Sequence, residues 1–190
     1  MNLANKLTFL RVLMIPLFVF FLLNNFYLIA LILFILASIT DALDGYIARK
    51  HNMVTDLGKL LDPLADKVLV ISALVCFIDV FRIPAWAVVI IIAREFVVTG
   101  FRLAVVQKDN KAVIAADVWG KIKTAFTMGA IIAIMVFHIA WYFVFVVFSK
   151  LYVSSQILYL ICNILIYICV ALTVISGITM IYKNRKLFTQ

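Results

Sequence analysis

Residues 151–182 read LYVSSQILYLICNILIYICVALTVISGITMIY, and this stretch decides the fold because it contains no Asp, Glu, Lys or Arg. It is longer than the run of about 20 apolar residues that crosses a bilayer as a helix. In the whole chain of 190 residues, 67% are hydrophobic and 14% are charged, against about 45–50% and about 25% in soluble domains. The composition excludes a soluble globular protein and indicates a polytopic membrane protein.

Apolar runs of similar length recur along the chain, separated by short breaks. The breaks include Asn24-Asn25, Arg82-Ile83-Pro84 and Ser149-Lys150. Six spans of about 20 residues leave no room for a separate soluble domain, so we expect one all-α membrane domain over residues 1–190. The six predicted transmembrane helices cover residues 3–23, 27–50, 58–80, 84–107, 118–148 and 151–182.

The basic residues are distributed unevenly between the two sides of the membrane that the six predicted helices would cross. Of 17 Lys and Arg residues, only Arg82 and Lys150 fall on one side and Arg94 falls inside a helix, while the rest share the other side. Lys and Arg are retained on the cytoplasmic side of membranes, so we expect both termini to be cytoplasmic. The same bias accounts for the net charge of +8. Because the bases are dispersed between apolar helices, no nucleic-acid partner is expected.

Most of the acidic residues gather in residues 40–68, TDALDGYIARKHNMVTDLGKLLDPLADKV. Asp41 and Asp44 are three residues apart, and Asp62 and Asp66 are four apart. Each pair therefore projects from one helical face. Four converging carboxylates repel one another and resist desolvation. Divalent cations offset both costs, and oxygen-only ligands suit Mg²⁺ or Mn²⁺.

The alternative is a solvated acidic loop, which fits poorly because these residues adjoin apolar runs, where ionisable groups are usually functional. Asp56 lies off the paired spacing and is expected to be solvated or to cap a helix. Pro63 disfavours helical angles at Asp62. We expect a kinked first helical turn there, with Asp62 acting as a helix cap as the alternative.

Together with small residues between them, the aspartates form D-x2-D-G-x2-A-R-x8-G-x3-D-x3-D. This pattern resembles the signature of the CDP-alcohol phosphatidyltransferases, membrane enzymes that join a CDP-activated donor to an alcohol and release CMP. The resemblance implies two metal ions on the four aspartates, space for cytidine at the small residues with an arginine nearby, and a homodimer. The matching residues are Asp41, Asp44, Gly45, Ala48, Arg49, Gly58, Asp62 and Asp66.

Three further segments are similar to the phosphatidylglycerophosphate synthase branch of that family: N-K-L-T-x-x-R at 5–11, AREFVVTGFR at 93–102 and WGKIKT at 119–124. Asn5, Thr8 and Arg11 form a polar stripe on an apolar helix. The resemblance implies that this stripe contacts the CDP group. Anchoring at the membrane interface is the alternative.

The second and third segments carry a group of basic residues. Arg94 and Arg102 share roughly one helical face, and Lys121 and Lys123 begin the next helix. Glu95 is a possible internal partner, but the local acids are too few to neutralise every base. A phosphate-bearing acceptor fits this group. Snorkelling of long basic side chains to the interface is the alternative.

The resemblance implies transfer of a phosphatidyl group from CDP-diacylglycerol to sn-glycerol 3-phosphate at the cytoplasmic side of the cell membrane, among membrane lipids. The products would be phosphatidylglycerol phosphate and CMP, with Asp66 as general base on the acceptor hydroxyl. Two alternatives stay open. One is a related transferase that uses phosphatidylglycerol, as in cardiolipin synthase, or inositol phosphate. The other is a divalent-cation transporter, which would place its carboxylates near the bilayer midplane.

Overall fold

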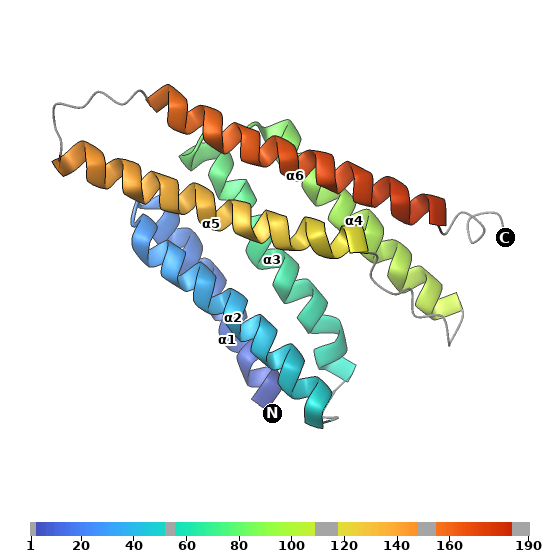
Figure 1. Ribbon diagram of the computed structural model, residues 1–190. Coiled ribbons are helices and arrows are strands. Elements are labelled where there is room, and N and C mark those ends of the chain that lie inside the picture. Colours follow the sequence, from blue (N-terminus) through green and yellow to red (C-terminus); the bar gives the residue numbers. More distant parts are fainter. Residues whose placement is uncertain (1–2, 52–55, 109–117, 148–154, 184–190) are drawn as a thin grey trace.

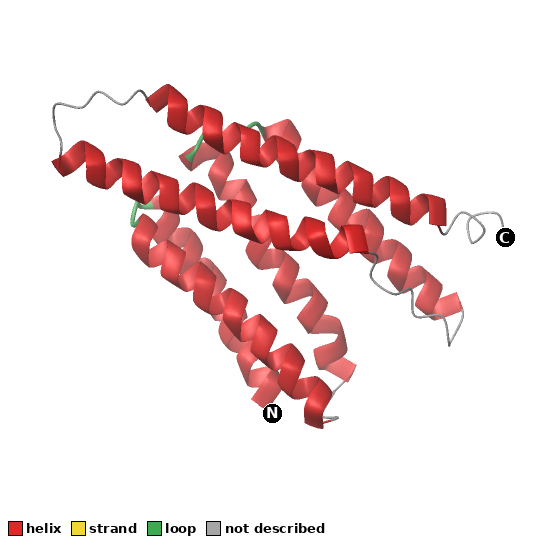
Figure 2. Ribbon diagram, viewed as in Figure 1, coloured by secondary structure: helices red, strands yellow, loops and turns green. Residues whose placement is uncertain are grey.

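A computed structural model describes residues 3–51, 56–108, 118–147 and 155–183, and nearly all of them are helical (Figure 2). Side chains are described for residues 9–40, 67–101, 118–144 and 156–183. The predicted all-helical fold is confirmed, and each helix begins and ends within a few residues of its predicted bounds. The helices are α1 (Leu3–Leu23), α2 (Tyr27–His51), α3 (Asp56–Val80), α4 (Ala85–Lys108), α5 (Val118–Val147) and α6 (Ser155–Lys183).

Helix α3 lies at the centre of the bundle, in contact with α1, α2, α4 and α5, while α6 packs on α4 and α5. Successive helices run in alternating directions (Figure 1). The ends of α2 and α4 therefore lie at the same end of the bundle as the starts of α3 and α5. We call this the α2–α3 end. It carries the aspartate motif and the basic segments.

Two of the predicted breaks are tight turns at the opposite end. Asn25 follows α1 with a φ of 65°, and the Phe26 amide donates to the Phe21 carbonyl at 2.9 Å. Arg82 follows α3 with a φ of 53°. A left-handed residue after the last turn is a common way to end a helix. The third predicted break, Ser149-Lys150, lies outside the described residues.

The helices approach one another closely because small side chains lie between them. Buried alanines occur on α2, α3, α4 and α5, and large side chains pack beside them. Phe18 and Phe34, for example, bring their ring centroids to 5.7 Å. Small residues at helix contacts are typical of membrane bundles, where van der Waals packing drives association. The alanines are Ala30, Ala37, Ala73, Ala87 and Ala130.

Among the residues whose side chains are described, two helical segments are long and apolar enough to cross a membrane, Val118–Val144 in α5 and Gln156–Lys183 in α6. Shorter apolar segments cover Phe9–Leu23 and Tyr27–Thr40. Many large apolar side chains also face outward, including Phe143 at 63% exposure, as expected of a surface that meets lipid. Six complete spans and cytoplasmic termini stay predictions.

Helix α3 begins earlier than expected. Its first residue is Asp56 rather than Gly58. The side chain of Asp56, expected to be solvated or to cap a helix, lies outside the described set. Asp62 therefore lies in the second turn of α3, so it is not the residue that caps the helix. Pro63 follows it within the same helix.

Candidate active site

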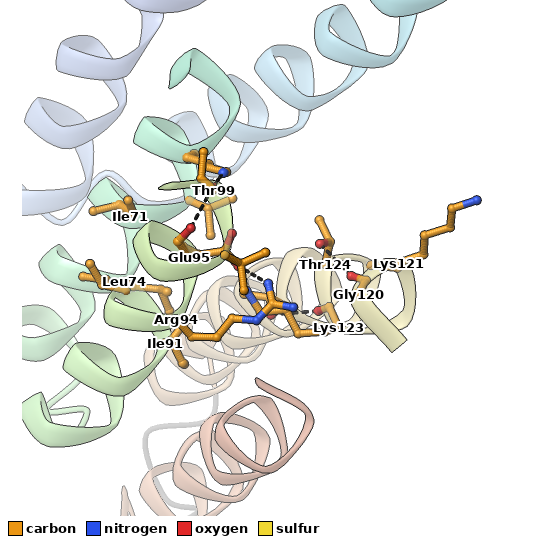
Figure 3. Close-up of a pocket in the computed structure, with 16 residues that line it drawn as sticks. Ile71, Leu74, Ile91, Arg94, Glu95, Thr99, Gly120, Lys121, Lys123 and Thr124 are labelled. Atoms are coloured by element: carbon orange, nitrogen blue, oxygen red, sulfur yellow. Dashed lines mark hydrogen bonds and ion pairs between the residues drawn. The ribbon is translucent and has the colours of Figure 1, made fainter. Parts of the chain in front are cut away.

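A cavity of about 510 Å³ lies between α3, α4 and α5 (Figure 3). Part of its wall is apolar and includes Ile71, Leu74 and Ile91. Charged and hydroxyl side chains line the rest. They are Lys67, Arg94, Glu95, Thr99, Lys121, Lys123, Thr124 and Thr127.

Glu95 joins two of the predicted basic residues. Its Oε1 accepts a hydrogen bond from the Lys123 ammonium and lies 3.5 Å from Arg94 Nη1. Figure 3 shows the three side chains among the residues that line the cavity. The predicted partnership of Glu95 with Arg94 is confirmed, and it also includes Lys123 on α5.

Lys123 and Lys121 have different environments although they are two residues apart. The Lys123 side chain is 3% exposed, so it does not snorkel to the surface. Lys121 is exposed, and its side chain extends away from Arg94 and Lys123 (Figure 3). A buried ammonium requires a close carboxylate, which Glu95 supplies. Lys123 is therefore fixed inside the site, whereas Lys121 lies at its rim.

The structure adds two residues that the sequence did not assign to the site. The Lys67 ammonium donates to Thr99 Oγ1, and the Thr99 hydroxyl donates to the Glu95 carbonyl at 2.7 Å. Lys67 directly follows Asp66 on α3, so this chain of contacts ties the aspartate-bearing helix to α4. Two features of the sequence could have indicated these residues: Lys67 is adjacent to Asp66, and Thr99 is four residues after Glu95 on the same helix.

Helix α6 also reaches the site. Arg94 Nη2 donates a hydrogen bond to Ser176 Oγ, and Ser176 is buried. The sequence of α6 had suggested only generic apolar helix. Arg94 is thus held from two sides, by Glu95 on its own helix and by Ser176 on α6.

The cavity has an excess of positive charge. Glu95 is the only acid among the described residues that line it, against four basic residues. Their side chains are strong hydrogen-bond donors, and the planar fork of Arg94 matches a phosphate. The arrangement suits an anionic ligand of phosphate size, beside an apolar wall.

We expect Glu95→Gln to destabilise the fold. The change leaves Lys123 buried without its carboxylate, and breaking such a pair costs about 3 kcal/mol, the lower end of the usual range because Glu95 keeps 17% exposure. Thermal unfolding of the purified chain in detergent measures the loss. Asp79→Asn, at an exposed position on α3, is the matched control and should change stability by less than about 0.5 kcal/mol. Equal midpoints for Glu95→Gln and wild type would contradict the pairing.

The structure describes the other predicted site residues only in part. Arg11 is fully buried in α1. The remaining residues lie on α1, α2, α3 and α4, and their side chains are outside the described set. Among the side chains that are described, no group of three or more His, Cys, Asp or Glu is placed to hold a metal. The residues with side chains outside the set are Asn5, Thr8, Asp41, Asp44, Gly45, Ala48, Arg49, Gly58, Asp62, Asp66 and Arg102.

Comparison with known proteins agrees with the sequence motifs to which these residues belong. The family model described as CDP-alcohol phosphatidyltransferase matches residues 1–175. A Bacillus subtilis protein named CDP-diacylglycerol--glycerol-3-phosphate 3-phosphatidyltransferase is 39% identical, over 96% of this chain and 95% of its own. Proteins of the same name from Rickettsia bellii and Rickettsia felis are 38% and 35% identical, each over 98% of this chain and 97% of their own. The chain therefore belongs to the CDP-alcohol phosphatidyltransferase family.

Proposed function

We propose that this chain transfers the phosphatidyl group of CDP-diacylglycerol to sn-glycerol 3-phosphate, giving phosphatidylglycerol phosphate and CMP. The observation that carries the proposal is the basic cavity beside the aspartate-bearing helix. Arg94 and Lys123 line it from α4 and α5, and Lys67, the residue after Asp66, lines it from α3. The names of the full-length relatives specify the same donor and acceptor.

The aspartates form the donor half of the proposed site. Asp41 and Asp44 lie near the end of α2, Asp62 and Asp66 lie in the first turns of α3, and the two helices contact each other. A set of only carboxylate oxygens fits Mg²⁺ or Mn²⁺. The four residues would hold two such ions, which would neutralise charge on the diphosphate of the donor.

The basic cavity forms the acceptor half. Arg94 and Lys123 would bind the phosphate of glycerol 3-phosphate, which leaves its far hydroxyl free to reach toward α3. Asp66 would take the proton of that hydroxyl. The hydroxyl oxygen then bonds to the lipid-side phosphorus, and the bond from this phosphorus to the CMP oxygen breaks with its electron pair leaving on CMP.

The membrane arrangement belongs to the same proposal. Six spans would place the α2–α3 end at the cytoplasmic face, because most Lys and Arg residues lie there. The charged groups of both substrates would then enter the site from the cytoplasm. The acyl chains of CDP-diacylglycerol would stay among the helices and lipids. The working unit would be a homodimer, as the family resemblance implies.

Release of CMP tests the proposed reaction directly. Purified chain in detergent with Mg²⁺ and CDP-diacylglycerol should release CMP only when glycerol 3-phosphate is added, with one phosphatidylglycerol phosphate formed for each CMP. CMP release that is independent of any acceptor would mean hydrolysis. Uptake of Mn²⁺ into proteoliposomes without CMP release would identify the transporter alternative instead.

Arg94→Lys is expected to weaken acceptor binding selectively. The change keeps the charge but removes the fork that matches a phosphate, so the apparent KM for glycerol 3-phosphate should rise about tenfold. The KM for CDP-diacylglycerol should stay within about twofold of wild type. Arg82→Lys, at an exposed position beyond the opposite end of α3, is the matched control. A parallel rise in both KM values would contradict the assignment of Arg94 to the acceptor.

A further inference from the structure

Arg94 forms a hydrogen bond with Ser176 on α6, a residue 82 positions away in the chain. Ser176 is 1% exposed, and its Oγ accepts a hydrogen bond from Arg94 Nη2. It does not line the cavity that Arg94 lines. Its hydroxyl therefore contacts the Arg94 guanidinium from outside that cavity. From there it can set the direction of the guanidinium without touching a ligand in the cavity.

Described contacts reach both terminal nitrogens of the Arg94 guanidinium. Two glycines flank the side chain: a Cβ at Gly120 would lie 3.9 Å from Arg94 Nη2, and one at Gly177 would lie 3.6 Å from Arg94 Cγ. Because glycine has no side chain, neither residue can form a side-chain hydrogen bond to the guanidinium. Glu95 reaches the Nη1 side only at 3.5 Å, and it also accepts from Lys123. On the Nη2 side, Ser176 Oγ accepts a hydrogen bond from the guanidinium and therefore bears on the plane of the fork.

We propose that Ser176 is a positioning residue of the anion site, which holds the Arg94 fork in the plane that a phosphate needs. This inference rests on the proposed function for which phosphate compound binds. It does not rest on the proposed function for the charge or the shape of the bound group. A fork recognises phosphate through two parallel hydrogen bonds, so its direction matters as much as its charge. Helix α6 thereby contributes to acceptor recognition although Ser176 touches no substrate.

Thr173 provides a matched control on the same helix. It lies one turn before Ser176, is fully buried, and shares with Arg94 an apolar cavity of about 410 Å³ between α4 and α6. Its hydroxyl makes no hydrogen bond within the described part of the chain. Thr173→Val and Ser176→Ala each remove one buried hydroxyl from α6, but only the second removes a bond to Arg94.

The kinetic test compares these variants in full-length protein. Ser176→Ala should raise the KM for glycerol 3-phosphate about fivefold to tenfold, with kcat and the KM for CDP-diacylglycerol within about twofold of wild type. Thr173→Val should leave all three unchanged. In an Arg94→Lys background, Ser176→Ala should add less than twofold, because an ammonium has no fork to orient. The same rise in KM in both backgrounds, or an equal effect of Thr173→Val, would overturn the proposal.

A binding test separates this inference from the identity of the acceptor. Inorganic phosphate should raise the thermal unfolding midpoint of wild type and Thr173→Val, and should raise that of Ser176→Ala less at every concentration. This result would support the role of Ser176 even if another phosphorylated acceptor proved to be the substrate. Equal shifts in wild type and Ser176→Ala would overturn it.

Discussion

Replacing Asp41, Asp44 or Asp62 by Asn is expected to abolish transfer, with losses of several orders of magnitude in kcat/KM. The amide keeps the shape of the side chain but removes the negative charge that a divalent cation requires. Because Asn carries no net charge, the helices that bear these residues should still pack. The measurement is CMP release at saturating Mg²⁺, together with the thermal unfolding midpoint of each variant.

Asp56→Asn is the matched control, since Asp56 belongs to the same acidic segment but lies at the first residue of α3 and off the paired spacing. It should retain nearly full activity. A variant at Asp41, Asp44 or Asp62 that kept more than about a tenth of wild-type activity would have lost less than about 1.4 kcal/mol of transition-state stabilisation. That result would contradict its assignment as a metal ligand.

Asp66→Asn should separate binding from chemistry. If Asp66 takes the proton of the acceptor hydroxyl, the variant should bind CDP-diacylglycerol and Mg²⁺ about as well as wild type yet turn over at least about a hundredfold more slowly. Equilibrium binding of the donor and single-turnover CMP release measure the two effects.

The outcome also separates two roles for this residue. An equal loss of donor affinity and of rate would make Asp66 a metal ligand that does not act as the base. The neighbouring Lys67 bonds to Thr99 on α4, so Lys67→Met should instead change acceptor kinetics and stability while leaving donor affinity within about twofold.

The helices could be predicted from sequence because local signals mark both their length and their ends. Apolar runs of membrane-spanning length gave the number and order of the helices. Asn25 and Arg82 adopt left-handed angles where polar residues interrupt those runs. The start of α3 was placed two residues late, because Pro63 and the polar residues before it weaken the signal in the first turns.

The basic cavity was predicted less completely because its contacts join distant residues. Arg94, Glu95 and Lys123 were identified from two short segments, and the structure brings them together. The bond from Arg94 to Ser176 had no local signal, since one serine in an apolar helix is usually bonded to its own backbone. Lys121 and Lys123 also looked equivalent in sequence, and only packing distinguishes the buried lysine from the exposed one.

The most direct test of the central claim is a competition between acceptors in one reaction. Wild-type protein with Mg²⁺ and CDP-diacylglycerol receives glycerol 3-phosphate, free glycerol, phosphatidylglycerol and inositol phosphate at equal concentrations, and mass spectrometry identifies the lipid products. A cavity built to bind the phosphate of a small acceptor predicts that phosphatidylglycerol phosphate dominates and that free glycerol gives almost no product. Products from glycerol at a comparable level, or a dominant cardiolipin or phosphatidylinositol phosphate product, would contradict it.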